Sequence, residues 1–121
     1  MAGYLLIVDD EFGLAELVAA LLAERGYETA LAINGKLALA SLRARPADLV
    51  LADTMMPVLD GPGLVAAMRA DDALRGIPII LMTALPELLP EMRAAGADAV
   101  LVKPFTLDQL LATMSTLLRT R

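Results

Sequence analysis

The sequence predicts an α/β fold, namely a three-layer, doubly wound, five-stranded parallel sheet with helices on both faces. Four short apolar runs, each bounded by polar residues and three of them rich in Val and Ile, are typical of strands buried on both faces. Segments with helical spacing lie between these runs, and right-handed crossovers then favour parallel strands. The 121 residues show no break in composition, so we expect one domain over residues 1–121.

The strands are predicted from the apolar runs at residues 5–8, 49–52, 79–82 and 99–102. Residues 27–33 fit a fifth strand at an edge of the sheet, because apolar and polar residues partly alternate there. Ligand binding in such a sheet is expected beyond the carboxyl ends of the strands.

Apolar residues spaced by three and four predict the helices. The first helix is closed by Gly26, where a left-handed cap fits, and Pro46 ends the second. The last helix starts with a capping box of Thr106 and Gln109. The stripes are Leu14, Leu17, Val18, Leu21 and Leu22; Leu37, Leu39 and Leu42; Leu64, Val65 and Met68; and Leu107, Leu110, Leu111, Met114, Leu117 and Leu118.

The fourth helix is predicted to be short or irregular. Pro86 and Pro90 interrupt the segment that would form it, and a proline disfavours helical geometry in the residue before it. We therefore expect Leu89 to lie outside the helix, which should begin near Pro90.

Composition excludes several classes of function. Ten Lys and Arg against fifteen Asp and Glu give a formal charge of −5, so the chain should repel nucleic acid on average. Without Cys or His, disulfides, Cys/His zinc sites and Ser-His-Asp catalysis are excluded. The longest uncharged stretch has eleven residues, against the ~18 needed to suggest a membrane span. No secretory signal precedes the first strand, which predicts a cytoplasmic location.

Polar side chains follow the predicted strands: Asp9 and Asp10 the first, Asp53 the third, Thr83 the fourth and Lys103 the fifth. Singly, they suit helix caps, turns and solvated surface charges. Together at one edge of a parallel sheet, three carboxylates would repel one another unless a cation such as Mg²⁺ neutralised them. A lysine and a hydroxyl could then contact phosphoryl oxygens, and Asp53 could act as a nucleophile. The constellation predicts a site for phosphoryl transfer.

The chain contains, in this order, the strings Ile7-Val8-Asp9-Asp10-Glu11, Asp53-Thr54-Met55-Met56-Pro57 followed by Asp60-Gly61, Thr83-Ala84, Gly96-Ala97-Asp98 and Lys103-Pro104-Phe105. Together they resemble receiver domains of the two-component response-regulator family, and the resemblance covers essentially the whole chain. The resemblance implies a flavodoxin-like strand order of 2-1-3-4-5 and a cis peptide bond between Lys103 and Pro104.

The roles of individual residues follow from the same resemblance. It implies that Asp53 accepts the phosphoryl group and that Mg²⁺ is bound by Asp53 and, directly, by Asp10. Asp9 would bind the ion through water and Met55 through its carbonyl oxygen. The resemblance also implies that Thr83 and Lys103 contact the phosphoryl group.

Two features depart from the family pattern. Val100 stands three positions before the lysine, where the family commonly has Tyr or Phe as a conformational switch. The segment 85–95 looks a residue or two shorter than usual and contains two prolines. It is either a tolerated loop variation or an altered output surface.

The function expected from this resemblance is a phosphorylatable signalling receiver, which catalyses only its own phosphorylation and dephosphorylation. Its partners would be a histidine kinase or phosphotransfer protein and a downstream protein target, with no direct contact to nucleic acid or membrane. We expect a monomer or a weak dimer through the fifth helix.

Three alternatives remain. The chain could be a fragment of a larger regulator or hybrid kinase. It could be a flavodoxin-like cofactor-binding module, although Asp9, Asp10 and Glu11 would repel an anionic phosphate. It could also be a small phosphatase that uses an aspartyl phosphate, but no lid is evident.

Overall fold

The computed structural model describes residues 3–119 and has a five-stranded parallel sheet in the order β2-β1-β3-β4-β5. The predicted fold class and strand order are confirmed, and the strand predicted at an edge is the edge strand β2. The strands are β1 (Tyr4–Val8), β2 (Glu28–Ala32), β3 (Leu49–Asp53), β4 (Ile79–Thr83) and β5 (Ala99–Val102).

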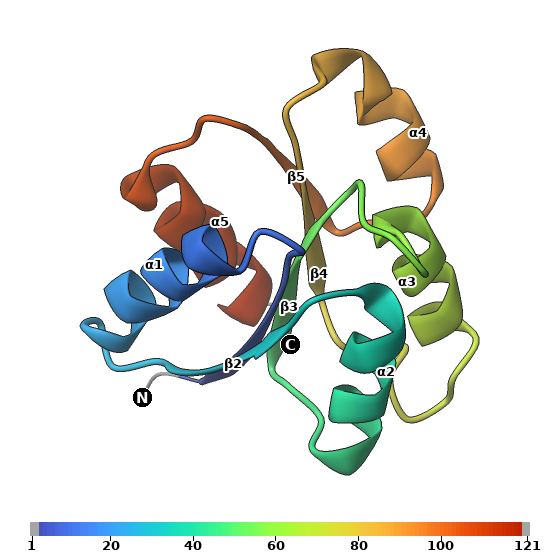
Figure 1. Ribbon diagram of the computed structural model, residues 1–121, viewed down its shortest axis with the longest axis horizontal. Coiled ribbons are helices and arrows are strands. Elements are labelled where there is room, and N and C mark those ends of the chain that lie inside the picture. The colour runs from blue at the N-terminus through green and yellow to red at the C-terminus, as the bar shows by residue number, and fades with distance from the viewer. Residues whose placement is uncertain (1–2, 120–121) are drawn as a thin grey trace.

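Helices cover both faces of the sheet. Figure 1 shows α1 and α5 on one side, and α2, α3 and α4 on the other. None of the helices within residues 3–119 combines the length and apolar character needed to cross a membrane. The helices are α1 (Phe12–Ala23), α2 (Gly35–Ala44), α3 (Gly61–Arg69), α4 (Leu89–Ala94) and α5 (Leu107–Arg119), with a 3₁₀ turn η1 (Pro86–Leu88) before α4.

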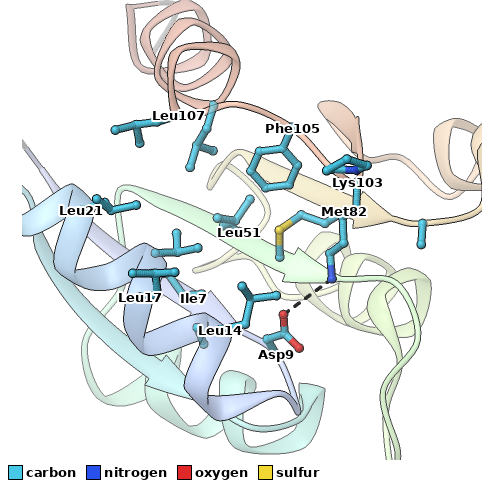
Figure 2. Close-up of a pocket in the computed structure, with 15 residues that line it drawn as sticks. Ile7, Asp9, Leu14, Leu17, Leu21, Leu51, Met82, Lys103, Phe105 and Leu107 are labelled. Atoms are coloured by element: carbon cyan, nitrogen blue, oxygen red, sulfur yellow. Dashed lines mark ion pairs between the residues drawn. The ribbon is translucent and has the colours of Figure 1, made fainter.

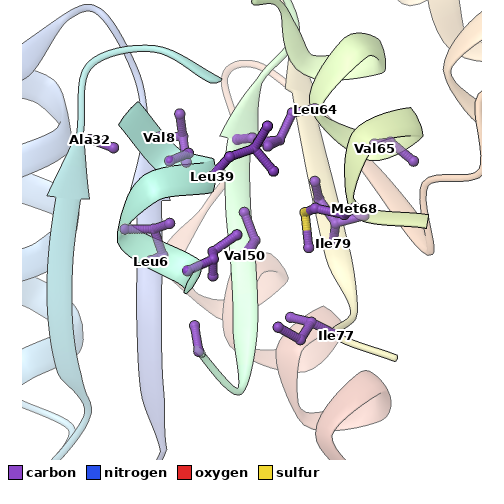
Figure 3. Packing of buried hydrophobic residues seen from close by; sticks show 14 of the residues in the cluster. Leu6, Val8, Ala32, Leu39, Val50, Leu64, Val65, Met68, Ile77 and Ile79 are labelled. Atoms are coloured by element: carbon purple, nitrogen blue, oxygen red, sulfur yellow. The ribbon is translucent and has the colours of Figure 1, made fainter. Parts of the chain in front are cut away.

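Each central strand contributes side chains to two hydrophobic cores, because successive side chains point to opposite faces of the sheet. Leu6, Val50 and Ile79 pack beneath α2 and α3 in one core, as Figure 3 shows. Leu5, Leu51 and Ile80 pack with residues of α1 and α5 in the other. Both sets are almost fully buried, which explains why the strands are continuous apolar runs.

Side-chain caps start three of the helices. The Asn34 side chain accepts a hydrogen bond from the Leu37 N–H at 2.8 Å, and Asp60 accepts one from the Gly63 N–H at 2.8 Å. The predicted capping box of α5 is present, with reciprocal hydrogen bonds between Thr106 and Gln109 at 2.8 and 3.0 Å.

The predicted apolar stripe of α1 is wrong in part. Leu14 and Leu17 remain 42% and 56% exposed, whereas Ala15 and Leu22 face the core. Nearly every position of α1 is apolar, so the periodicity of its sequence could not select the face that packs on the sheet. In α2, Leu37 is likewise 48% exposed while Leu39 and Leu42 are buried.

The fourth helix is short, as predicted, with six residues. The expectation that Leu89 lies outside it is wrong, because Leu89 has helical dihedral angles of −52° and −46° and is the first helical residue. Pro90 then occupies the first turn, where a missing N–H costs no intrahelical hydrogen bond.

Arg69, at the end of α3, ties together the loops at the amino-terminal edge of the sheet. Its guanidinium donates to the carbonyl oxygens of Arg75 and Ile77, each at 2.9 Å. It also donates to the Asp98 carboxylate at 2.6 Å and to the Gly96 carbonyl at 3.2 Å. One side chain thereby links the segments that lead into β4 and β5.

We expect Arg69→Met to lower the free energy of unfolding by about 2 kcal/mol, because it removes four charge-assisted hydrogen bonds, of which the one to the Ile77 carbonyl is partly buried. Urea denaturation measures the loss. Arg43→Met is the matched control, since Arg43 is 60% exposed and pairs with Asp71 at 3.5 Å. The control should cost at most about 0.5 kcal/mol. Equal losses in the two variants would contradict a specific role for Arg69.

Candidate functional site

Parallel pairing aligns the carboxyl ends of β1 and β3. Val8 is paired with Ala52, so the residues that follow them, Asp9 and Asp53, lie abreast on neighbouring strands. The Asp9 N–H donates to the Ala32 carbonyl at 3.0 Å and thereby extends the pairing with β2 by one residue. The positions of both carboxylates thus follow from the strand register.

Three carboxylates converge at this edge of the sheet. Carboxylate oxygens of Asp9, Asp10 and Asp53 all lie within 4.8 Å of one another. Asp9 is buried, the side chain of Asp53 is 16% exposed, and Asp10 is exposed. Among residues 3–119, these form a cluster of oxygen donors suited to a hard divalent cation such as Mg²⁺.

The electrostatics of Asp9 favour a bound cation. Burial raises the pKa of the Asp9 carboxyl above its ordinary value of 3.8, and the charges of Asp53 and Asp10 raise it further. The Glu11 N–H, which donates to Asp9 at 2.9 Å, and the Lys103 ammonium act in the opposite direction. A divalent ion would stabilise the charged form that burial disfavours, so the residues present fit Mg²⁺.

Lys103 supplies a positive charge to the cluster. Its Nζ lies 3.2 Å from an Asp53 oxygen and 3.8 Å from an Asp9 oxygen. Figure 2 shows the side chain reaching from the end of β5 toward Asp9. The Lys103 N–H donates to the Thr83 carbonyl at 2.7 Å, which joins its backbone to β4. The Lys103–Pro104 peptide bond is cis, as the family resemblance implies.

Thr83 ends β4, one residue beyond Met82, which pairs with Asp53. Its buried hydroxyl accepts a hydrogen bond from the Leu85 N–H at 3.0 Å and lies 3.4 Å from the Leu85 carbonyl, to which it donates. The hydroxyl is therefore at the expected edge of the sheet, but here it holds the loop that leads toward α4.

Thr54 is a structural residue of the site that the sequence reasoning did not single out. Its buried hydroxyl donates to the Met82 carbonyl at 2.6 Å and lies 2.8 Å from the sulfur of Met92 in α4. Thr54 thereby connects the end of β3 with both β4 and α4. A hydroxyl directly after Asp53, at the end of an apolar strand, is the signal that could have identified it.

The loop after β3 folds back onto Asp53. The Gly61 N–H donates to the Thr54 carbonyl at 2.9 Å. A Cβ at position 61 would lie 2.7 Å from the Asp53 carbonyl oxygen and 2.9 Å from the Thr54 Cα, so this approach requires glycine. At the tip of the loop, Val58 adopts a left-handed φ of 72°. The side chain of Met55, the residue expected to bind Mg²⁺ through its carbonyl, is 65% exposed.

The predicted site residues thus gather at one edge of the sheet, and the contacts join them in two groups. One is the ionic cluster of Asp9, Asp10, Asp53 and Lys103. Thr83 belongs to the other, because its hydroxyl contacts the backbone of Leu85. The first group combines a nucleophilic carboxylate with charges that can bind a cation and a phosphoryl group.

The sequence profile described as "Response regulator receiver domain" matches residues 5–115. Among curated proteins, the DNA-binding response regulator MtrA of Mycolicibacterium paratuberculosis is 35% identical over 117 residues, which cover 95% of this chain and 51% of that protein. The chain spans about half the length of the curated relatives it matches.

Solved structures show the same similarity. The receiver domain of a signal transduction histidine kinase from Syntrophus aciditrophicus has a TM-score of 0.92 and 35% identity, covering 98% of this chain and 92% of that one. The chemotaxis response regulator CheY4 of Vibrio cholerae has a TM-score of 0.88 and 31% identity, covering 97% and 99%. The chain therefore belongs to the response regulator receiver domain family of two-component signalling.

Proposed function

We propose that Asp53 accepts a phosphoryl group from the phosphohistidine of a kinase or phosphotransfer protein, with Mg²⁺ held by Asp9, Asp10, Asp53 and the Met55 carbonyl. The observation that carries this proposal is the gathering of three carboxylates within 4.8 Å, with the Lys103 ammonium 3.2 Å from Asp53. Membership of the receiver family supports the same assignment.

The chemistry is an in-line displacement at phosphorus. An Asp53 oxygen forms the new P–O bond while the P–N bond to the donor imidazole breaks, and that electron pair stays on the imidazole nitrogen. Lys103 neutralises charge on the phosphoryl oxygens, and bound Mg²⁺ would supply further electrostatic stabilisation there. Attack by water on the acyl phosphate later releases phosphate and restores Asp53. The chain thus promotes only its own phosphorylation and dephosphorylation.

The output is a change in contacts with a downstream protein. For its hydroxyl to bind a phosphoryl oxygen, Thr83 has to give up the hydrogen bond to the Leu85 carbonyl, so the loop before α4 has to rearrange. Val100 has no ring that could change orientation, and α4 has only six residues. A change in the backbone order of residues 83–95 on phosphorylation therefore transmits the signal to the downstream protein.

Several further properties are part of the proposal. The domain acts in the cytoplasm and makes no direct contact with nucleic acid or membrane. If it is a fragment of a larger regulator or hybrid kinase, such contacts belong to other domains. It stays monomeric or forms a weak dimer through α5, whose outward residues are small and mostly uncharged: Asp108, Gln109, Ala112, Thr113 and Thr116.

Phosphorylation should occur at Asp53 alone. Incubation with acetyl phosphate and Mg²⁺ is expected to add one phosphoryl group, detected by intact-mass spectrometry. Asp53→Asn should abolish the addition, because the amide is a poor nucleophile at phosphorus. Glu11→Gln is the control, since Glu11 is a neighbouring exposed carboxylate outside the cluster, and it should be modified like the parent chain. Undiminished modification of Asp53→Asn would refute the assignment.

Mg²⁺ should be required for phosphorylation and should stabilise the fold. Excess chelator is expected to stop the reaction, because three carboxylates then repel the incoming phosphate. A tenfold excess of Mg²⁺ over its dissociation constant should add about 1.4 kcal/mol of stability, measured by thermal unfolding. Asp10→Asn should lose most of this gain, and Glu11→Gln should keep it.

The stabilisation by Mg²⁺ should also depend on pH. Because burial raises the pKa of Asp9, protons compete with the ion at a higher pH than at an ordinary aspartate. The shift in unfolding temperature is therefore expected to shrink as the pH falls through that raised pKa. Undiminished phosphorylation in excess chelator would contradict Mg²⁺ binding at these carboxylates. So would an Mg²⁺-induced shift in unfolding temperature that Asp10→Asn leaves unchanged.

Phosphorylation should change amide exchange over residues 83–95. Thr83→Ser keeps the hydroxyl and should preserve the change, whereas Thr83→Val should abolish it even when Asp53 is phosphorylated. Hydrogen exchange and light scattering after size-exclusion chromatography measure loop order and assembly. The same exchange response in Thr83→Val would contradict the role of the hydroxyl. A phosphorylation-driven dimer disrupted by substitutions in α4 but not in α5 would contradict the proposed assembly.

A further inference from the structure

A deep apolar groove of about 470 Å³ separates α1 from α5. Figure 2 shows Leu14, Leu17 and Leu21 on one wall, with Phe105 and Leu107 across from them. This volume lies within the roughly 300–1,000 Å³ that is typical of small-molecule sites. A largely apolar lining is also typical of such sites. The proposed phosphoryl-transfer chemistry uses none of these five side chains.

The groove reaches the side chains of the sheet. Its floor is formed by Ile7, Leu51 and Met82, which are only 1–3% exposed although they line it. At the mouth, Leu14 and Leu17 are 42% and 56% exposed.

The composition of α1 makes its groove-facing surface apolar, and such a surface is unfavourable in contact with water. Glu16 is the only charged residue among its twelve, and a helix that is apolar all round is normally buried. Leu14 and Leu17 nevertheless contact solvent. An apolar ligand between α1 and α5 would remove this surface from water and gain the corresponding free energy.

The polar end of the groove selects the charge of a ligand. Asp9 and Lys103 line this end, and Asp10 and Asp53 complete the cluster of carboxylates beside it. Three carboxylates and one ammonium carry a net charge of −2, and the whole chain carries −5. A cationic group is therefore attracted to this end and an anionic group is repelled.

We infer that the groove binds a small amphiphilic cation, with its alkyl chain between α1 and α5 and its cationic head at the Asp9 end. The inference goes beyond phosphoryl transfer and requires no phosphorylation of Asp53. It has one consequence for the site: the cationic head and Mg²⁺ compete for the same carboxylates, so that each weakens the binding of the other.

The test uses dodecyltrimethylammonium, below its micelle concentration, as the probe. The protein carries ¹³C-labelled methionine methyl groups and no phosphodonor is added. Met82 on the groove floor should shift on titration. Met68, which is fully buried in the core on the other face of the sheet, should not. Mg²⁺ should weaken the apparent affinity several-fold, and dodecyl sulfate at the same concentration should leave Met82 unshifted.

A matched pair of variants separates the groove from the rest of the surface. Leu17→Gln should weaken binding of the probe about fivefold or more, because the alkyl chain loses an apolar wall. Leu37→Gln should bind like the parent chain, since Leu37 has similar exposure but lies on α2, away from the groove.

Several outcomes would overturn the inference. They are no shift of Met82, equal shifts of Met82 and Met68, and equal weakening by the two variants. Equal binding of dodecyl sulfate would reject the cationic head. A Met82 response to a basic amphipathic peptide, but not to the amphiphile, would reassign the groove to a protein helix. None of these measurements depends on phosphorylation, so failure here is distinguishable from failure of the Asp53 assignment.

Discussion

The parallel register of β1 against β3 is the constraint on which the whole site depends. Pairing of Val8 with Ala52 places Asp9 and Asp53 side by side at the edge of the sheet. The neighbouring pair of Asp53 with Met82 then places Thr83 one step further along β4. A slip of one residue in either strand would move a carboxylate to the other face of the sheet. The buried apolar strands prevent that slip, so the core determines the geometry of the charges.

The same arrangement has an electrostatic cost, because it holds like charges together where water is partly excluded. Burial raises the pKa of Asp9, and Lys103 offsets only part of the repulsion among the three carboxylates. An unfavourable cluster of this kind is typical of a functional site rather than of a stabilising one. The stabilising polar contacts lie elsewhere, as in the contacts of Arg69 at the opposite edge of the sheet.

The two faces of the sheet are closed to different degrees. On one face, α2 and α3 contact each other and bury Leu64, Val65 and Met68 completely. On the other, a groove remains between α1 and α5 that reaches side chains of the sheet. Thr54 links the end of β3 to α4 on the first face, while Lys103 borders the groove on the second. Asp53 is therefore connected to α4 through the adjacent Thr54, and to the edge of the groove through its ion pair with Lys103.

The sequence alone determined the strands, their parallel direction and the residues at their carboxyl ends, because apolar runs and the residues that follow them are local properties of the chain. The order of the strands in the sheet came from the resemblance to receiver domains. The sequence also indicated the capping box of Thr106 and Gln109, whose two residues are three positions apart. The face that α1 presents to the sheet could not be predicted, since its apolar residues surround the helix.

Other features depended on contacts between residues far apart in the sequence. Thr54 contacts Met92, which is 38 residues away in the sequence, and Lys103 contacts Asp53, which is 50 residues away. The helical geometry of Leu89, which local preference before a proline opposes, is likewise a property of the folded chain. Local pattern thus determined which residues reach the edge of the sheet. Tertiary packing decided which of them touch and where the groove stays open, because those contacts depend on how the helices sit on the sheet.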